Sequence, residues 1–223
     1  MSKESYSNKD IVYFINPRLD LVSMLPDNPK QKVLEIGMGG GDTLLHIKQN
    51  NLASEVTGID IIELPGTNQT NPLIDKVHFI DLDKEALPFL PASFDVIIAG
   101  DTLEHLINPW SVLEKLSGVL KHGGHMLISL PNIRDMYALF PIVLKGNFEY
   151  TDKGIFDKTH MRFFCKKNMI KLVEHGGHLK IEKIIPIQNF GKANLKRKLF
   201  NKLTLKIFEE FTTTQYLIKA VKV

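Results

Sequence analysis

The stretch that decides the fold is Lys32–Asp42, KVLEIGMGGGD, in a chain of 223 residues. Its first part, Lys32–Ile36, is a short apolar run typical of a buried β-strand. Four glycines follow within five positions, and a helical pattern begins at Asp42. Glycine lets the backbone turn sharply and approach a ligand without a Cβ in the way, although tight packing alone can also require it. The order of strand, glycine turn and helix predicts a βαβ unit with a ligand at the turn.

Similar apolar runs recur along the chain and alternate with helical segments. The predicted strands are Lys32–Ile36, Glu55–Asp60, Lys76–Ile80, Phe94–Ala99, His125–Ser129, Leu179–Ile187 and Tyr216–Val223. Helices are expected at Asp42–Asn50, at Pro109–Leu120 and around Lys166–His175. This alternation predicts an α/β fold with a doubly wound, mostly parallel seven-stranded sheet. Ligands of such sheets bind at the carboxyl ends of the strands, so the loops after the strands are the candidate site.

Composition sets the class of protein. The chain is 43% hydrophobic and 24% charged and has one cysteine, Cys165, which excludes a disordered or disulfide-stapled chain and fits one domain. Apolar runs are too short for a membrane-spanning helix, and the polar first residues, MSKESYSNKD, lead us to expect a cytoplasmic protein. The net charge of +3 is too small to indicate DNA as a partner, and RNA is not expected either.

The residue that follows the glycines restricts the ligand. The dinucleotide fingerprint G-x-G-x-x-G needs glycine at position 42, where this chain has Asp42. A carboxylate at a helix N-terminus repels a pyrophosphate, which disfavours a nicotinamide dehydrogenase and favours a ligand without phosphates. Asp60, at the end of the second predicted strand, can accept hydrogen bonds from ribose hydroxyls. The alternative for Asp60 is a simple helix cap.

Three blocks of sequence resemble class I S-adenosylmethionine (SAM)-dependent methyltransferases. VLEIGMGGG is similar to the first motif of that family, GIDI to its ribose-binding strand, and Ile80–Asn132 to its third to fifth motifs. The resemblance covers about residues 30–188. It implies a single methyltransferase domain over 1–223, a Rossmann-like fold and SAM as the cofactor. The implied cofactor-binding residues are Glu35, Gly37, Gly39, Gly41, Asp60, Ile61, Asp81, Leu82 and Asp101. For Asp81, which lies in an acidic loop, a solvated turn is the alternative.

Two histidines are the candidate catalytic residues. If Asp101–Leu106 forms one helical turn, Asp101, Glu104 and His105 share a face directed at the cofactor. The segment Phe156–Phe164, FDKTHMRFF, is similar to a D-x-T-H-x-R-F-F segment in methyltransferases linked with glycan biosynthesis. In one interpretation His105 and His160 deprotonate or orient a hydroxyl acceptor, a task that suits neutral imidazole near pH 7.

Two other interpretations of these histidines remain open. Certain small-RNA and quinone O-methyltransferases resemble this chain at E-x-x-E-H plus a distant histidine, where the cluster holds a divalent metal ion. The possible metal ligands here are Asp101, Glu104, His105 and His160, with aspartate at 101 where those families have glutamate. In the remaining interpretation the histidines only make structural hydrogen bonds.

The expected surroundings of the site are a helical rim over residues 1–29 and an acceptor-covering insertion over 132–159. A basic amphipathic helix is expected at 191–211, where Leu199, Leu203 and Ile207 would form an apolar stripe. That helix either docks on the sheet or makes weak peripheral contact with an anionic membrane or a phosphate-bearing acceptor.

The sequence therefore predicts a SAM-dependent methyltransferase that O-methylates a hydroxylated small molecule or a glycan. One alternative is a metal-dependent O-methyltransferase acting on RNA ribose or on a catechol or quinol. Another is a non-catalytic, cofactor-binding partner of a glycosyltransferase.

Overall fold

The computed structural model describes residues 9, 14–188, 199, 202–204 and 207–223. In this part of the chain seven strands form one sheet in the order β3-β2-β1-β4-β5-β7-β6. The strands are β1 (Lys32–Ile36), β2 (Glu55–Asp60), β3 (Lys76–Phe79), β4 (Phe94–Gly100), β5 (Leu120–Pro131), β6 (Leu179–Ile187) and β7 (Gln215–Lys222). Strands β1 to β5 pair in parallel, and β7 runs antiparallel to both β5 and β6. The predicted seven-stranded, mostly parallel sheet is confirmed.

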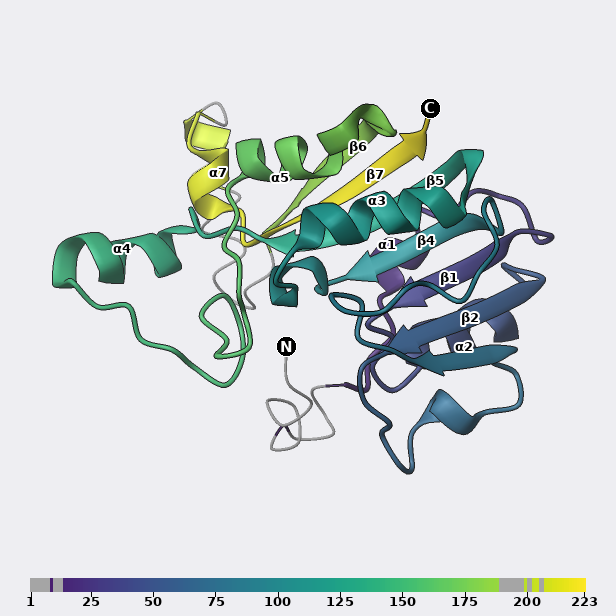
Figure 1. The fold of residues 1–223 in the computed structure, drawn as a ribbon. Coiled ribbons are helices and arrows are strands. Elements are labelled where there is room, and N and C mark those ends of the chain that lie inside the picture. The colour runs from purple at the N-terminus through teal and green to yellow at the C-terminus, as the bar shows by residue number, and fades with distance from the viewer. Residues whose placement is uncertain (1–8, 10–13, 189–198, 200–201, 205–206) are drawn as a thin grey trace.

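Helices cover both faces of this sheet, as a doubly wound fold requires (Figure 1). On one face, α3 (Pro109–Val119) and α5 (Lys166–Val173) pack over a core that includes Leu34 of β1. On the other, α1 (Leu19–Val22) and α2 (Asp42–Gln49) pack over a core that includes Val33. Successive residues of a strand point to opposite faces, so the run of apolar residues in β1 supplies both cores.

The order in which the parallel strands are added to the sheet changes direction at β1. Strand β2 and then β3 extend the sheet to one side of β1, whereas β4, β5, β7 and β6 extend it to the other. The loops that leave β1 and β4 therefore diverge at the carboxyl edge of the sheet and open a crevice between them. The 3₁₀ turns η3 (Asn68–Thr70) and η4 (Leu103–His105) lie at this edge, whereas η5 (His175–Gly177) precedes β6 at the opposite edge.

The segments around the sheet differ in part from the expected ones. Within the described residues, the expected helical rim over 1–29 is limited to the four-residue α1. The expected insertion over 132–159 contains α4 (Met136–Lys145), which projects away from the sheet before the chain loops back (Figure 1). The expected helix over 191–211 lies largely outside the described residues, and what is described of it ends in α7 (Glu209–Thr212). None of the helices that the structure describes is long and apolar enough to cross a membrane.

Candidate active site

A cavity of about 720 Å³ lies at the carboxyl ends of β1, β2 and β4. Its wall combines the glycine turn after β1 with the turns after β2, β3 and β4, with the segment before α1 and with the loop that contains His160. Eight acidic residues line it: Asp20, Glu35, Asp60, Asp81, Asp83, Asp101, Glu104 and Asp135. Arg18 is the one lysine or arginine among the described lining residues. The cavity therefore suits a ligand that carries positive charge.

The glycine turn has a conformation that other residues adopt poorly. Gly37, Gly39 and Gly41 have φ values of +64°, +53° and +85°. A Cβ on Gly37 would lie 2.5 Å from Oγ1 of Thr102, and one on Gly39 would lie 2.9 Å from the carbonyl oxygen of Phe14. Gly37 and Gly39 line the cavity, whereas Gly41 lies at the start of α2 and is not among the lining residues. Both close packing and exposure to the cavity therefore require glycine here.

Asp60 connects the glycine turn to the turn after β2. Its Oδ2 accepts a hydrogen bond from the Gly39 N–H at 2.9 Å, and its Oδ1 accepts from the N–H groups of Ile61 and Ile62 at 2.8 and 3.2 Å. Burial raises the pKa of Asp60 above its usual value, against the opposing effect of these hydrogen bonds. Asp60 and Ile61 both line the cavity, so the aspartate holds the backbone of the site and also offers it a carboxylate.

Glu35 is a buried carboxyl group on the cavity wall. It is 3% exposed, and burial raises its pKa to about 8. Its Oε2 atom has no hydrogen-bond partner among the described residues. A buried acceptor without a donor is costly, so Glu35 is suited to receive a hydrogen bond from a ligand.

Asp81 and Leu82 line the cavity after β3. Burial raises the pKa of Asp81, but the hydrogen bond from Lys84 at 2.9 Å and the N–H of Asp83 outweigh burial and hold the pKa below its usual value. Asp83 in turn accepts hydrogen bonds from the backbone N–H groups of Ile107 and Asn108. Asp81 and Asp83 thus lie on the wall of the cavity, while Lys84 and Glu85 of the same loop are exposed.

Asp101 lies directly after β4 in a left-handed conformation, with φ of +49°. Its N–H donates to Ser129 Oγ at 2.9 Å, and the Ser129 hydroxyl donates to Asp101 Oδ1 at 2.9 Å. The helical turn expected over 101–106 is wrong at its start, because η4 begins at Leu103 and Ser129 fixes Asp101 outside it. Asp101 therefore does not share a helix face with Glu104 and His105.

Arg18 is a site residue that sequence reasoning missed. Its guanidinium donates to Asp101 Oδ2 at 2.7 Å and to both carboxylate oxygens of Asp20 at 2.9 and 3.0 Å. Burial opposes its charge, but the two aspartates outweigh burial and hold the pKa of Arg18 above its usual range. The local signal was the Arg-Leu-Asp sequence at 18–20, which no known motif marks.

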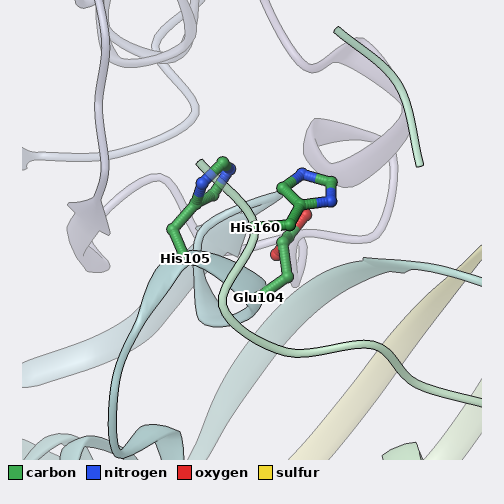
Figure 2. A group of neighbouring side chains, drawn as sticks. All are labelled: Glu104, His105 and His160. Atoms are coloured by element: carbon green, nitrogen blue, oxygen red, sulfur yellow. The ribbon is translucent and has the colours of Figure 1, made fainter. Parts of the chain in front are cut away.

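Three potential metal ligands gather beside the cavity: Glu104, His105 and His160. Figure 2 shows Glu104 and His105 on neighbouring positions of η4, with His160 brought beside them by a separate loop. The loop is held there because the Glu104 carbonyl accepts hydrogen bonds from the N–H groups of Met161 and Arg162 at 2.8 and 3.0 Å. One potential ligand atom from each of the three side chains lies within 4.8 Å of the others.

Backbone carbonyls orient both imidazole rings. Nδ1 of His105 lies 3.2 Å from the Thr159 carbonyl, and Nδ1 of His160 lies 2.9 Å from the Ile155 carbonyl. A carbonyl only accepts, which assigns the proton of each neutral ring to Nδ1 and makes Nε2 the basic nitrogen. Burial lowers the pKa of His105 to about 4 and also lowers that of His160, so both rings are neutral near pH 7.

Glu104 is the carboxylate of this group. It is 1% exposed, and burial raises its pKa well above the usual value. Its Oε2 atom has no hydrogen-bond partner among the described residues. Of the four possible metal ligands that the sequence suggested, the structure brings together Glu104, His105 and His160 and leaves Asp101 with Arg18.

Comparison with known proteins connects this geometry to a family. Residues 34–128 match the family model described as a methyltransferase domain. The structures of SAM-dependent methyltransferases from Archaeoglobus fulgidus and Mesorhizobium loti each cover 92% of this chain. The chain covers 91% and 96% of theirs, with TM-scores of 0.62 and 0.60 and identities of 20% and 16%. The fold is that of a SAM-dependent methyltransferase.

Among curated relatives, a ubiquinone biosynthesis O-methyltransferase from Dechloromonas aromatica is 31% identical over 134 residues. The alignment covers 58% of this chain and 57% of that enzyme. The chain thus spans a little over half the length of this relative. The matched family segment, 34–128, contains the glycine turn and most of the acidic wall of the methyltransferase fold, and it ends before the loop with His160.

The cavity fits SAM by its own chemistry. SAM is a nucleoside with a cationic sulfonium and a charged amino-acid end, and it has no phosphate. The acidic wall, the partnerless Oε2 of Glu35 and the left-handed glycines at the turn suit such a ligand. Arg18, which is paired with Asp20 and Asp101, is the one arginine or lysine on the described wall that would face the carboxylate of the same ligand.

Proposed function

We propose that this chain is a SAM-dependent methyltransferase that methylates a hydroxyl group of a small molecule or a glycan. The observation that carries the proposal is the pair His105 and His160, two neutral imidazoles fixed by backbone carbonyls on the wall of an acidic cavity. The glycan acceptor rests on the likeness of residues 156–164 to the D-x-T-H-x-R-F-F segment. The single cysteine fits a reducing, cytoplasmic setting.

SAM, when bound, supplies a methyl group that its sulfonium makes electrophilic. Gly37, Gly39 and Asp60 would hold its nucleoside and chain, and Asp81 with Leu82 the far end of the nucleoside. The remaining task of the protein is to orient the acceptor hydroxyl and to receive its proton.

The two histidines have different capacities for that task. A pKa of about 4 makes His105 a weak base at neutral pH. His160 is less buried, and the lowering of its pKa is smaller, so it keeps more basicity. We assign proton acceptance to Nε2 of His160. His105, whose ring lies edge to face with that of His160, is assigned to positioning.

Binding and turnover measurements test this function. Calorimetry with SAM and with S-adenosylhomocysteine is expected to show binding of both, and lack of binding to either would refute the proposal. Mass spectrometry then detects methyl transfer to a panel of sugars, catechols and quinols. SAM binding without turnover on the whole panel would favour a non-catalytic partner of a glycosyltransferase.

A metal-dependent O-methyltransferase is the second candidate. The observation that favours it is the cluster of Glu104, His105 and His160, whose ligand atoms lie within 4.8 Å of one another. Two imidazole nitrogens and one carboxylate suit Zn²⁺ or Mn²⁺. The Dechloromonas aromatica relative is named for ubiquinone biosynthesis, which supports a catechol or quinol acceptor for this candidate, with RNA ribose as the alternative.

Chelation separates the two candidates. If EDTA leaves turnover intact, the metal-dependent candidate is wrong. If EDTA abolishes turnover and one of Mg²⁺, Mn²⁺ or Zn²⁺ restores it, the three side chains are metal ligands. Equilibrium dialysis of the same ions against the Glu104→Gln variant is the matched control, because it removes one charged ligand and keeps both imidazoles.

A further inference from the structure

Exposed apolar side chains are concentrated in two segments of the described chain. Of 17 large hydrophobic side chains that are exposed, ten lie within 137–150 or 199–208. These ten are Tyr137, Phe140, Val143, Leu144, Phe148, Tyr150, Leu199, Leu203, Ile207 and Phe208. Single exposed hydrophobic residues are ordinary on a protein surface, but such a concentration marks a binding surface.

The first segment is built around α4. Every residue from Met136 to Leu144 is apolar, so this helix has no polar face to present to water. Ala138 is 2% exposed and faces the body of the protein, whereas Val143 and Leu144 are 67% and 75% exposed. A helix that is hydrophobic all round is normally covered, and Figure 1 shows α4 projecting away from the sheet.

The second segment is joined to the base of α4. Leu199, Leu203 and Ile207 are spaced four residues apart, and each is more than half exposed. Just beyond them, Glu210 of α7 forms an ion pair with Arg134, and its carbonyl accepts a hydrogen bond from Asn132 at 2.7 Å. Arg134 and Asn132 immediately precede α4, so the two apolar segments emerge from the same part of the molecule. We name them together the α4 surface.

Cationic residues accompany the α4 surface. Lys145, at the end of α4, and Lys153, shortly after it, are exposed, as are Glu149 and Asp152, and the exposed Lys158 forms an ion pair with Asp152 at 2.9 Å. In the sequence, residues 191–206 contain six basic residues and no acidic ones. Of these basic residues the structure describes Lys202, which is exposed beside Leu203. Apolar and aromatic side chains beside lysines are the composition that binds at the interface of an anionic bilayer.

We propose that the α4 surface docks on an anionic lipid bilayer. Tyr, Phe, Val and Leu side chains enter the headgroup region, and the neighbouring lysines contact anionic headgroups. Tyr137 and Ala138 of the same helix also line the cavity, so docking places the mouth of the site at the membrane surface. The proposal does not rest on the proposed function, because vesicle binding needs neither SAM nor an acceptor.

Vesicle co-sedimentation of the full chain tests the proposal. Phosphatidylcholine vesicles are compared with and without phosphatidylglycerol, at about 0.1 M and about 1 M salt, where the Debye length falls from about 10 to about 3 Å. We expect binding to the anionic vesicles that weakens about tenfold at high salt. The affinity of the Leu144→Glu variant for anionic vesicles is expected to be about tenfold lower than that of the unchanged protein, because the substitution places a carboxylate on the outward face of α4.

Leu90→Glu is the matched control. Leu90 is also an exposed leucine, with 79% of its surface accessible, but it lies outside both segments. It is expected to bind vesicles as the unchanged protein does, and near-ultraviolet circular dichroism verifies that both variants are folded. Equal loss in both variants, or no binding to anionic vesicles, overturns the proposal. A third outcome also overturns the proposal: the protein does not bind vesicles, sedimentation velocity shows a dimer, and the Leu144→Glu variant is a monomer. In that case the α4 surface joins two copies of the chain.

Discussion

The imidazole rings of His105 and His160 meet edge to face, with their centroids 4.6 Å apart and their planes at 77°. The two residues are 55 positions apart in sequence, and the contact exists because the loop after Asp157 is bonded to the backbone of η4. The pair is thus a product of the tertiary fold. Its chemistry can be tested by removing each ring separately.

Replacing His160 by alanine is expected to lower kcat about 10²- to 10⁴-fold, the range for loss of a general base. SAM affinity should be unchanged, since the assigned role of His160 concerns the acceptor. His105→Ala should lower kcat less, because a positioning residue is lost and the base remains. Methyl-transfer kinetics and calorimetry measure the two effects. His122→Ala, at an exposed histidine, is the control and should leave both quantities unchanged.

Glu35→Gln is expected to stabilise the ligand-free protein in alkaline solution. The pKa of Glu35 rises from about 4.5 when unfolded to about 8 when folded, so its ionisation favours the unfolded state above pH 4.5. The cost grows as the pH rises towards 8, and it reaches the order of a few kcal/mol there. Denaturant unfolding at pH 5 and pH 8.5 should show a gain for the variant at the higher pH alone.

The same Glu35→Gln variant should bind SAM more weakly at pH 8.5, where Glu35 is mostly ionised, because the cationic ligand loses a carboxylate partner. A variant that gains no stability at pH 8.5 would show that the pKa of Glu35 is not raised in the folded protein. Thr57→Val serves as a control for a buried polar group in the neighbouring strand β2, since its hydroxyl has no charge to titrate.

Gly37→Ala should destabilise the protein more than Gly66→Ala. Both glycines have positive φ, +64° and +79°, so both variants bear the backbone strain of alanine in that region. A Cβ at Gly37 would also meet Thr102 Oγ1 at 2.5 Å, whereas nothing lies within 4 Å of one at Gly66. The difference in free energy of unfolding is expected to be about 1–3 kcal/mol, the usual cost of overpacking.

A second substitution checks the cause of that difference. Thr102→Ala removes the two side-chain atoms nearest to the added Cβ, and it should recover part of the loss in the Gly37→Ala background. If the double variant is as unstable as the sum of the single variants, the clash with Thr102 is not the cause.

Arg18→Met should weaken SAM binding about 10- to 100-fold, the equivalent of one charge-assisted hydrogen bond at about 1.5–3 kcal/mol. Its effect on stability should remain within about 1 kcal/mol, because its partners Asp101 and Asp20 are partly exposed and solvent screens the pairs. Lys48→Met is the matched control: Lys48 and Asp75 form an ion pair of similar exposure at 2.8 Å that does not line the cavity. Equal SAM affinity in both variants would remove Arg18 from the site.

The parts of the fold that follow from local chemistry were predictable. Strands β1, β2 and β6 have the residue bounds that apolar patterning predicted. Strand β5 begins at Leu120, five residues earlier than predicted, because Leu120 pairs with Phe94 before the glycines at 123 and 124. The two glycines interrupt the apolar pattern of residues 120–125, so the sequence did not predict a strand there. The pairing depends on Phe94 of the neighbouring strand β4, which the local pattern does not show.

The site was predictable where side chains lie next to strand ends, as with Glu35, Asp60 and Asp81, because strand ends of a parallel sheet share one edge. It was not predictable where distant segments meet. Arg18, in a segment that carries no recognised motif, donates a hydrogen bond to Asp101. Lys9, still earlier in the chain, donates one to Asp157. Asp101 itself departs from the expected turn because Ser129, on a different strand, fixes its backbone.

Strand β7 has a consequence for how the molecule is made. It is the last strand of the sheet to be synthesised, yet it lies between β5 and β6. Until β7 has been synthesised, β5 and β6 each have an edge whose backbone N–H and C=O groups are unpaired. Such edges can pair with other chains. A chain that ends before Gln215 leaves the edges of β5 and β6 open and leaves Asp101 without its contact to Gln215. The sheet therefore closes only after β7 has been synthesised.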